Sequence, residues 1–212
     1  MDIEIKNLQK KFNDNEVLKD ISLKIEKNKS TIILGQSGCG KSVLIKIIYQ
    51  LLNYEKGTIL YEGKKNIDID KFSMLFQYGA LFDSLSLSEN IAFTDYMHNK
   101  INYSRKVKSL MADVGLDASN YHKYPSEVSG GMKKRAALAR ALYKNPKVIF
   151  LDEPTTGLDP INSDLINDLI IKVIKKRKIT AVTITHDIKS AIKTGDNFYF
   201  IDKGITQEEG RC

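Results

Sequence analysis

The chain has 212 residues, of which 42% are hydrophobic and 28% are charged, a composition that is ordinary for a folded domain and excludes an intrinsically disordered chain. It contains no apolar run near the roughly 20 residues of a membrane-spanning helix and no signal-peptide pattern, and its two cysteines, Cys39 and Cys212, are too few for a disulfide framework, so we expect a protein of the reducing cytoplasm. The 33 Lys and Arg against 26 Asp and Glu give a net charge of +7, but the lysines are spread along the chain, which favours a mildly basic solvated surface over a nucleic-acid site.

The first 34 residues are predicted to form strands. Ile3–Ile5 and Ile21–Ile25 alternate apolar with polar residues, as half-buried strands do, and Thr31–Leu34 is a short apolar run. Between the first two strands, Phe12 lies in the polar segment Lys10–Asn15, which we expect to be a loop. An exposed aromatic ring there can stack on an adenine base, although an isolated aromatic residue is more often a packing residue.

A glycine-rich segment, Gly35–Ser42, joins the third strand to a predicted helix over Val43–Leu52. It matches the phosphate-loop pattern G-x-x-x-x-G-K-[ST] in the strand–loop–helix context that the pattern requires, which disfavours a turn that matches by accident. Lys41 is expected to reach the β- and γ-phosphates of a nucleotide, and the Ser42 hydroxyl to ligate Mg²⁺. The loop backbone and the helix N-terminus favour a polyphosphate, so the predicted phosphate-binding residues are Gly35, Gln36, Ser37, Gly38, Cys39, Gly40, Lys41, Ser42 and Val43.

The middle of the chain changes from strands to helices. Gly57–Gly63 and Phe72–Phe76 are predicted strands, and Gln77 ends the second of them. From Tyr78 to Tyr143 the pattern is mainly helical, which indicates an inserted helical subdomain. Its predicted helices are one with a capped start at Ser88-Glu89-Asn90, one over Arg105–Val114, and one that follows Ser129 and ends before Pro146.

The last third of the chain carries polar residues at the ends of buried strands. Its predicted elements are a strand over Val148–Leu151, a helix over Ile161–Lys178, a strand over Thr180–Thr185, a short helix, a strand over Phe198–Ile201 and a closing turn at Lys203–Gly204. Asp152 and Glu153 follow the first of these strands and His186 follows the second. Ligands of open parallel sheets bind at the carboxyl ends of the strands, so these side chains and Gln77 are expected at one site.

Each of these polar residues has a proposed role in the chemistry of a bound nucleotide. Asp152 is expected to hold Mg²⁺ through water, Glu153 to polarise the attacking water as general base, and His186 to contact the γ-phosphate. The Gln77 amide is expected to sense the metal or the water. Strand-end acids can instead be solvated charges, and a lone histidine is more often structural, but a phosphate loop in the same chain favours the catalytic interpretation.

A second glycine motif, Ser129-Gly130-Gly131, opens a predicted helix. A helix N-terminus attracts anions, and the chain has one phosphate loop for its own nucleotide, so the nucleotide of a partner chain would fill this second site. The alternative is an ordinary capped helix start, because serine is a common N-cap residue. Two consecutive glycines are poor residues for capping alone.

Taken together, these residues resemble the ATP-binding-cassette (ABC) ATPases over nearly the whole chain. The motifs that occur in the order of that family are the phosphate loop, Gln77, Ser129-Gly130-Gly131, Leu151-Asp152-Glu153-Pro154, Gly157-Leu158-Asp159 and His186. The resemblance implies an α/β P-loop NTPase fold with a RecA-like core, an antiparallel β subdomain and an inserted helical subdomain. Residues 1–212 would form one ATPase domain, with the core at about 1–77 and 145–212 and the helical subdomain at about 78–144. In such a cassette Phe12 stacks on adenine, Asp159 lies at a dimer interface, and Ser129, Gly130 and Gly131 contact the ATP of the opposite protomer.

A narrower resemblance is to the ATPases of Mla/Mce-type phospholipid transporters. It rests on two segments, 76–83 and 125–135, and on Met132, where most cassettes carry glutamine. It implies ATP and Mg²⁺ as cofactors, phospholipid transport powered from the cytoplasmic face of the inner membrane, and as partners a second ATPase copy, an integral membrane permease and a lipid-binding subunit, but no nucleic acid. The alternatives are a cassette of an amino-acid or lipoprotein transporter and a soluble cassette that acts outside transport. The apolar residues Tyr78, Leu81 and Phe82 are expected to form a groove for a cytoplasmic helix of the permease.

Overall fold

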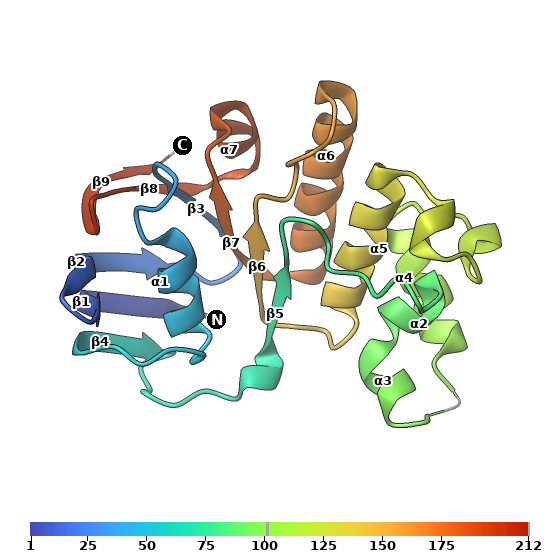
Figure 1. The fold of residues 1–212 in the computed structure, drawn as a ribbon, viewed down its shortest axis with the longest axis horizontal. Coiled ribbons are helices and arrows are strands. Elements are labelled where there is room, and N and C mark those ends of the chain that lie inside the picture. Colours follow the sequence, from blue (N-terminus) through green and yellow to red (C-terminus); the bar gives the residue numbers. More distant parts are fainter. Residues whose placement is uncertain (101, 212) are drawn as a thin grey trace.

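Nine strands form one mixed sheet in the residues that the computed structural model describes, 1–100 and 102–211 (Figure 1). Cys212 lies outside the described residues, and Cys39 is a free cysteine. Across the sheet the strand order is β4-β1-β2-β9-β8-β3-β7-β6-β5. The strands are β1 (Ile3–Phe12), β2 (Asn15–Ile25), β3 (Ser30–Leu34), β4 (Lys56–Tyr61), β5 (Phe72–Leu75), β6 (Val148–Asp152), β7 (Thr180–Thr185), β8 (Asn197–Asp202) and β9 (Ile205–Arg211).

Strand direction divides the sheet into two parts. β5, β6, β7, β3 and β8 run parallel, each paired with its neighbour in that order, whereas β1 pairs antiparallel with both β2 and β4. This confirms the predicted α/β core with an antiparallel β subdomain. Because the parallel strands bring their carboxyl ends to one edge of the sheet, polar residues that follow β3, β5, β6 and β7 must lie close together.

The helices between β5 and β6 gather beside the β5 edge of the sheet (Figure 1). The α-helices are α1 (Lys41–Ile48), α2 (Leu87–Ile91), α3 (Phe93–Met97), α4 (Ser104–Asp113), α5 (Gly130–Leu142), α6 (Pro160–Arg177) and α7 (Ile188–Thr194), and the short 3₁₀ helices are η1 (Ile69–Lys71), η2 (Ala118–Asn120) and η3 (Pro125–Glu127). The segment between β5 and β6 thus contains α2 to α5 and no strand among its described residues. This is the helical insertion that the sequence predicts.

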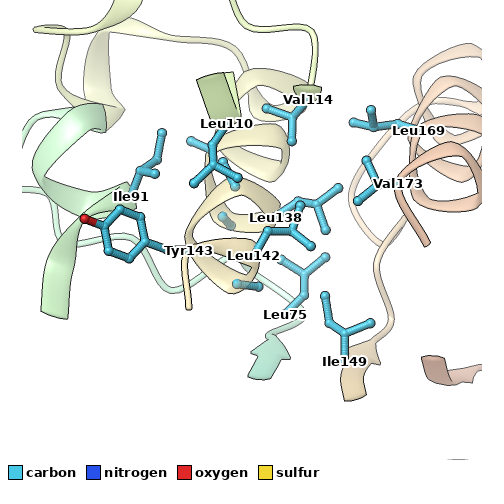
Figure 2. Close-up of a cluster of buried hydrophobic side chains, with 14 of the residues drawn as sticks. Leu75, Ile91, Leu110, Val114, Leu138, Leu142, Tyr143, Ile149, Leu169 and Val173 are labelled. Atoms are coloured by element: carbon cyan, nitrogen blue, oxygen red, sulfur yellow. The ribbon is translucent and has the colours of Figure 1, made fainter. Parts of the chain in front are cut away.

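Helix α5 anchors the helical insertion to the sheet. One cluster of buried side chains joins α4 and α5 to β5, β6 and α6, and Figure 2 shows Leu138 and Leu142 of α5 close to Leu75 of β5 and Ile149 of β6. Small alanines along α5 let the helix approach its neighbours closely, since Ala136, Ala137 and Ala139 are at most 1% exposed. A second cluster packs α1 against the antiparallel strands and the core sheet.

Two helices, α1 and α2, differ from their predicted bounds by two residues or more, whereas α4 and α6 differ by one residue at each end. The cap of α2 is Ser86, two residues before the predicted Ser88: its hydroxyl accepts from the Glu89 N–H at 3.3 Å, and the Glu89 carboxylate accepts from the Ser86 N–H at 2.7 Å. This reciprocal pair is a capping box. Helix α1 ends at Ile48 rather than at Leu52.

Two strand predictions were wrong, both for tertiary reasons. Phe12 is the last residue of β1 and pairs with Asn15 across the hairpin instead of lying in a loop. Register shifts after Ile5 interrupt the alternation of β1 and hide its continuation in the sequence pattern. The chain also does not stop pairing at the turn after β8, because β9 pairs antiparallel with β8 although its sequence is mostly polar.

Candidate functional site

A cavity of about 610 Å³ opens at the carboxyl edge of the parallel strands. The phosphate loop between β3 and α1 forms one wall, and residues that follow β5, β6 and β7 form the other. The predicted residues that line it are Gln36, Ser37, Gly38, Gly40, Lys41, Ser42, Val43, Gln77, Asp152, Glu153 and His186. Val17 of β2 and Ile184 of β7 line it as well, and no motif in the sequence marks those two.

The phosphate loop is shaped to bind an anion. Gly40 forms the N-terminal cap of α1 with φ +102°, a conformation that favours glycine, and no side chain caps the helix. The first N–H groups of α1 are therefore free of side-chain partners. The Lys41 ammonium donates to the carbonyl oxygens of Gly35 at 2.7 Å and Gln36 at 2.8 Å, so a buried positive charge already lies within the loop.

Opposite the loop, Glu153 is held by three side chains. His186 Nδ1 lies 2.7 Å from Glu153 Oε1, and the hydroxyls of Thr185 and Thr156 donate to Glu153 Oε2 at 3.2 and 3.4 Å. The His186 side chain is 72% exposed whereas that of Glu153 is 13% exposed, so the ring extends from the carboxylate toward solvent. The sequence predicted both residues at the site, but not their contact with each other or the two threonines.

Glu153 also has an unusual backbone. Its φ is +46°, which costs of order 1 kcal/mol for a residue with a side chain, while its N–H still donates to the Ile184 carbonyl at 2.9 Å. The sheet pairing therefore continues one residue beyond β6 and fixes the strained residue in place. The Glu153 side chain contacts Thr185, the last residue of the neighbouring strand β7, and His186, the residue that follows it.

The electrostatic surroundings of Asp152 favour a bound cation. Burial raises the pKa of Asp152 above its ordinary value, the neighbouring Glu153 charge raises it further, and the Lys41 and Lys134 ammonium groups oppose this shift. A divalent cation would relieve both unfavourable effects. Ser42, Gln77 and Asp152 line the same cavity, and the hydroxyl, amide and carboxylate oxygens of such residues, completed by waters and phosphate oxygens, suit Mg²⁺. The residues present therefore fit this ion.

Four predicted residues in two segments do not line the cavity of their own chain. Ser129 caps α5, its hydroxyl accepting from the Met132 N–H at 3.3 Å, which is the capping alternative noted above. Asp159 caps α6 in the same way and accepts from the Asn162 N–H at 3.0 Å. The two segments lie side by side, because a Cβ on Gly131 would be 3.6 Å from Asn162 Oδ1, and one on Gly130 would be 3.8 Å from Leu158 Cδ2. They form one region at the N-termini of α5 and α6, outside the cavity of the phosphate loop.

Phe12 also lies outside the cavity lining. Phe12 is 43% exposed at the end of β1, and the Lys10 ammonium lies over its ring, 5.0 Å from the centroid. An aromatic ring with this exposure offers a surface on which a flat base can stack. Gly35 lines no cavity wall either, but a Cβ there would meet the Ile201 carbonyl oxygen at 2.3 Å, so glycine is required for the loop to leave the sheet.

Comparison with known proteins supports the assignment of this cavity as a nucleotide-binding site. The family model described as "ABC transporter" matches residues 18–156. The intermembrane phospholipid transport system ATP-binding protein MlaF of Haemophilus influenzae is 36% identical over 211 residues, which cover 94% of this chain and 80% of the relative. The glutamine transport ATP-binding protein GlnQ of Escherichia coli is 36% identical over 220 residues, which cover 98% of this chain and 90% of the relative.

Two further comparisons concern a relative that is longer than this chain and a solved structure. The probable ribonucleotide transport ATP-binding protein mkl of Mycobacterium leprae is 37% identical over 208 residues, which cover 92% of this chain but 59% of the relative, so the chain spans about six-tenths of that protein. A dimeric ATP-binding cassette in a post-hydrolysis state with ADP and Pi superposes with a TM-score of 0.83 at 26% identity, covering 99% of this chain and 98% of the other. Among the described residues, none of the helices has the length and apolar character to cross a bilayer. The chain belongs to the ABC transporter family and carries its ATP-binding ATPase domain.

Proposed function

We propose that the chain hydrolyses MgATP in the cavity between the phosphate loop and the strand ends, and that hydrolysis powers phospholipid transport. The observation that carries the proposal is the Glu153 carboxylate, held by His186, Thr185 and Thr156 opposite Lys41. Residues 1–212 would act as one ATPase domain, with a core of about 1–77 and 145–212 and a helical subdomain of about 78–144.

The geometry supports a distinct role for each side chain. The backbone of residues 35–43 and the Lys41 ammonium would bind the phosphates, and Phe12 would stack on the adenine. Glu153 would accept the proton of the attacking water, and its three hydrogen bonds limit the orientations of the carboxylate. His186 would contact the γ-phosphate with the part of its ring that Glu153 leaves free. Mg²⁺, held by Ser42, Asp152 and Gln77, would neutralise charge on the phosphate oxygens.

We infer that two copies share each ATP. The segments at Ser129–Gly131 and at Asp159 do not line the cavity of their own phosphate loop, and the solved cassette cited above is a dimer. A Cβ at Gly131 meets its nearest neighbour at 3.6 Å, an ordinary contact, so Gly131→Asp is expected to fold normally. Any loss of hydrolysis then reports on the partner's site.

Mixed dimers test this arrangement. Neither the Lys41→Ala homodimer nor the Gly131→Asp homodimer is expected to hydrolyse ATP. A dimer with one chain of each kind contains one intact composite site and one that is damaged twice, so mixing the two inactive proteins should restore activity. Wild-type hydrolysis by the Gly131→Asp homodimer would rule out the shared site.

An apolar groove of about 490 Å³ between β5 and the helical insertion would receive a cytoplasmic helix of the permease. Phe82 lines it and stacks on Phe93 with ring centroids 4.5 Å apart. Leu81 and Tyr78, which the sequence also placed there, do not line it: Leu81 packs on the core of the insertion, and Tyr78 is 80% exposed outside the groove. Of the three residues expected in the groove, Phe82 alone lines this one, and a turn at Gly79 and Ala80, both with positive φ, separates Tyr78 from Leu81.

Phe82→Asp is therefore a better probe of this groove than Leu81→Asp. In a complex co-expressed with its genomic permease and purified by the permease, Phe82→Asp is expected to abolish co-purification and to leave ATP binding unchanged. Met97→Asp, on the same insertion and 60% exposed outside the groove, is the matched control. Unchanged recovery of the Phe82→Asp chain would refute the groove.

The proposal that phospholipid is the transported substrate rests on similarity to MlaF, whose name assigns it to phospholipid transport. The complex would contain the ATPase pair, the permease and a lipid-binding subunit, with no nucleic acid, and the ATPase would lie on the cytoplasmic face of the inner membrane. The test is transfer of labelled phospholipid between vesicles by the reconstituted complex with MgATP. GlnQ is as similar and is named for glutamine transport, so glutamine uptake without phospholipid transfer would move the assignment to amino-acid transport.

A further inference from the structure

Two cationic side chains of α5, Lys134 and Arg140, bind the backbone that carries Gln77. The Lys134 side chain, only 7% exposed as a residue, donates from Nζ to the Gln77 carbonyl oxygen. Further along α5, the Arg140 guanidinium donates to the carbonyl oxygens of Gly79 at 2.6 Å and Ala80 at 2.7 Å. Residues 77–80 thus place three carbonyls on cationic side chains of a single helix.

The contact between α5 and this segment is close as well as charged. Gly79 has φ +75°, and a Cβ added to it would lie 3.2 Å from the Ala137 Cβ. That is tighter than an ordinary contact, so the backbone of the segment rests directly on α5. Small residues on both sides and cations at both ends hold the segment in one position.

The Lys134 ammonium interacts with the acidic residues of the nucleotide site as well as with the Gln77 carbonyl. Burial lowers the pKa of Lys134, while the charges of Asp152 and Glu153 raise it, so the ammonium stands near the acidic pair of the nucleotide site as well as on Gln77. Removing an ammonium from water without a partner is costly. Here the Gln77 carbonyl and the field of the two carboxylates offset that cost.

We propose that Lys134 is a positioning residue of the ATPase site, which together with Arg140 ties residues 77–80 to α5 and so fixes the backbone from which the Gln77 side chain enters the cavity. The proposal rests on the proposed function, in which Gln77 meets Mg²⁺ or water.

Replacement of the Lys134 charge tests the positioning role. Lys134→Met keeps the buried methylenes and removes the ammonium, so we expect ATP affinity within about twofold of wild type and kcat lowered about tenfold, since a hydrogen bond from a charged donor is strong. Lys134→Arg should restore most of the rate. Lys133→Met removes the neighbouring charge and should leave both constants unchanged.

The melting temperature and kcat together distinguish a positioning role of Lys134 from a role in packing alone. A lysine that only stabilises the fold would lower the melting temperature in Lys134→Met and leave kcat of the folded protein at the wild-type value, which would overturn the proposal. Absence of hydrolysis in the wild-type complex would instead refute the proposed function.

Discussion

Glutamine in place of Glu153 removes the proposed base while preserving its surroundings. The Gln Oε1 can still accept from Thr185 and Thr156, and its amide can donate to His186 Nδ1, so the contacts at 2.7 to 3.4 Å survive. Loss of a general base costs about 10²–10⁴-fold in rate, which corresponds to about 2.7–5.4 kcal/mol of transition-state stabilisation. We expect kcat to fall by this factor and ATP affinity to stay within about twofold of wild type.

The contact between His186 and Glu153 makes the prediction sharper. His186→Ala removes one hydrogen bond to a charged acceptor, worth about 1.5 kcal/mol at a partly solvated site and hence about tenfold in kcat. If part of this loss acts through Glu153, His186→Ala should cost less in the Glu153→Gln background than in wild type. The remaining effect measures the direct contact of His186 with the γ-phosphate.

The assay is steady-state hydrolysis by the purified complex, with ATP binding measured separately at equilibrium. Near wild-type kcat in Glu153→Gln would refute the assignment of the base. Equal factors for His186→Ala in both backgrounds would show that the two residues act independently, despite the 2.7 Å contact.

Three further predictions concern charged side chains. Lys41→Ala should raise the dissociation constant for ATP about 10–100-fold in an equilibrium titration, because a charge-assisted contact with phosphate is lost, and unchanged affinity would contradict the role of the loop. Because burial raises the folded pKa of Asp152 above its ordinary 3.8, the folded chain holds that proton more tightly than the unfolded chain, and stability falls as pH rises above about 4. Asp152→Asn should therefore raise the melting temperature of nucleotide-free protein at pH 7, with no gain near pH 3, and abolish stabilisation by Mg²⁺ in the presence of ATP. Hydrogen bonds from Lys176 and Arg177 hold the pKa of Asp113 below 3.8, so its contribution is present above about pH 4 and is lost as pH falls through the lowered value. Asp113→Asn should cost about 1 kcal/mol at neutral pH, a drop in melting temperature of about 2–4 °C that disappears near pH 2, and an equal drop at both pH values would contradict the ion pair.

Local features of the sequence were enough to predict most of the parallel core. The apolar runs at Val148–Leu151 and Thr180–Thr185 predict buried strands, since both faces of a parallel sheet are covered, and both strands are present with nearly the predicted bounds. The phosphate loop was equally evident, because its glycines are required by backbone geometry at the loop itself. Since the carboxyl ends of parallel strands share one edge, the sequence also predicted that Asp152, Glu153 and His186 would meet the loop, and they line the same cavity.

Contacts between distant side chains were decided only in the folded chain. His186 meets Glu153 across 33 residues and Lys134 meets Gln77 across 57, and no spacing rule in the sequence connects either pair. Phe82 lines the apolar groove whereas Leu81 packs on the buried core, a difference that the sequence pattern did not predict. Likewise β9, with few apolar residues, is a strand because β8 offers it hydrogen-bonding partners. Periodicity and glycine geometry are encoded within a few neighbouring residues, whereas these contacts depend on packing energies that exist only once the segments are brought together.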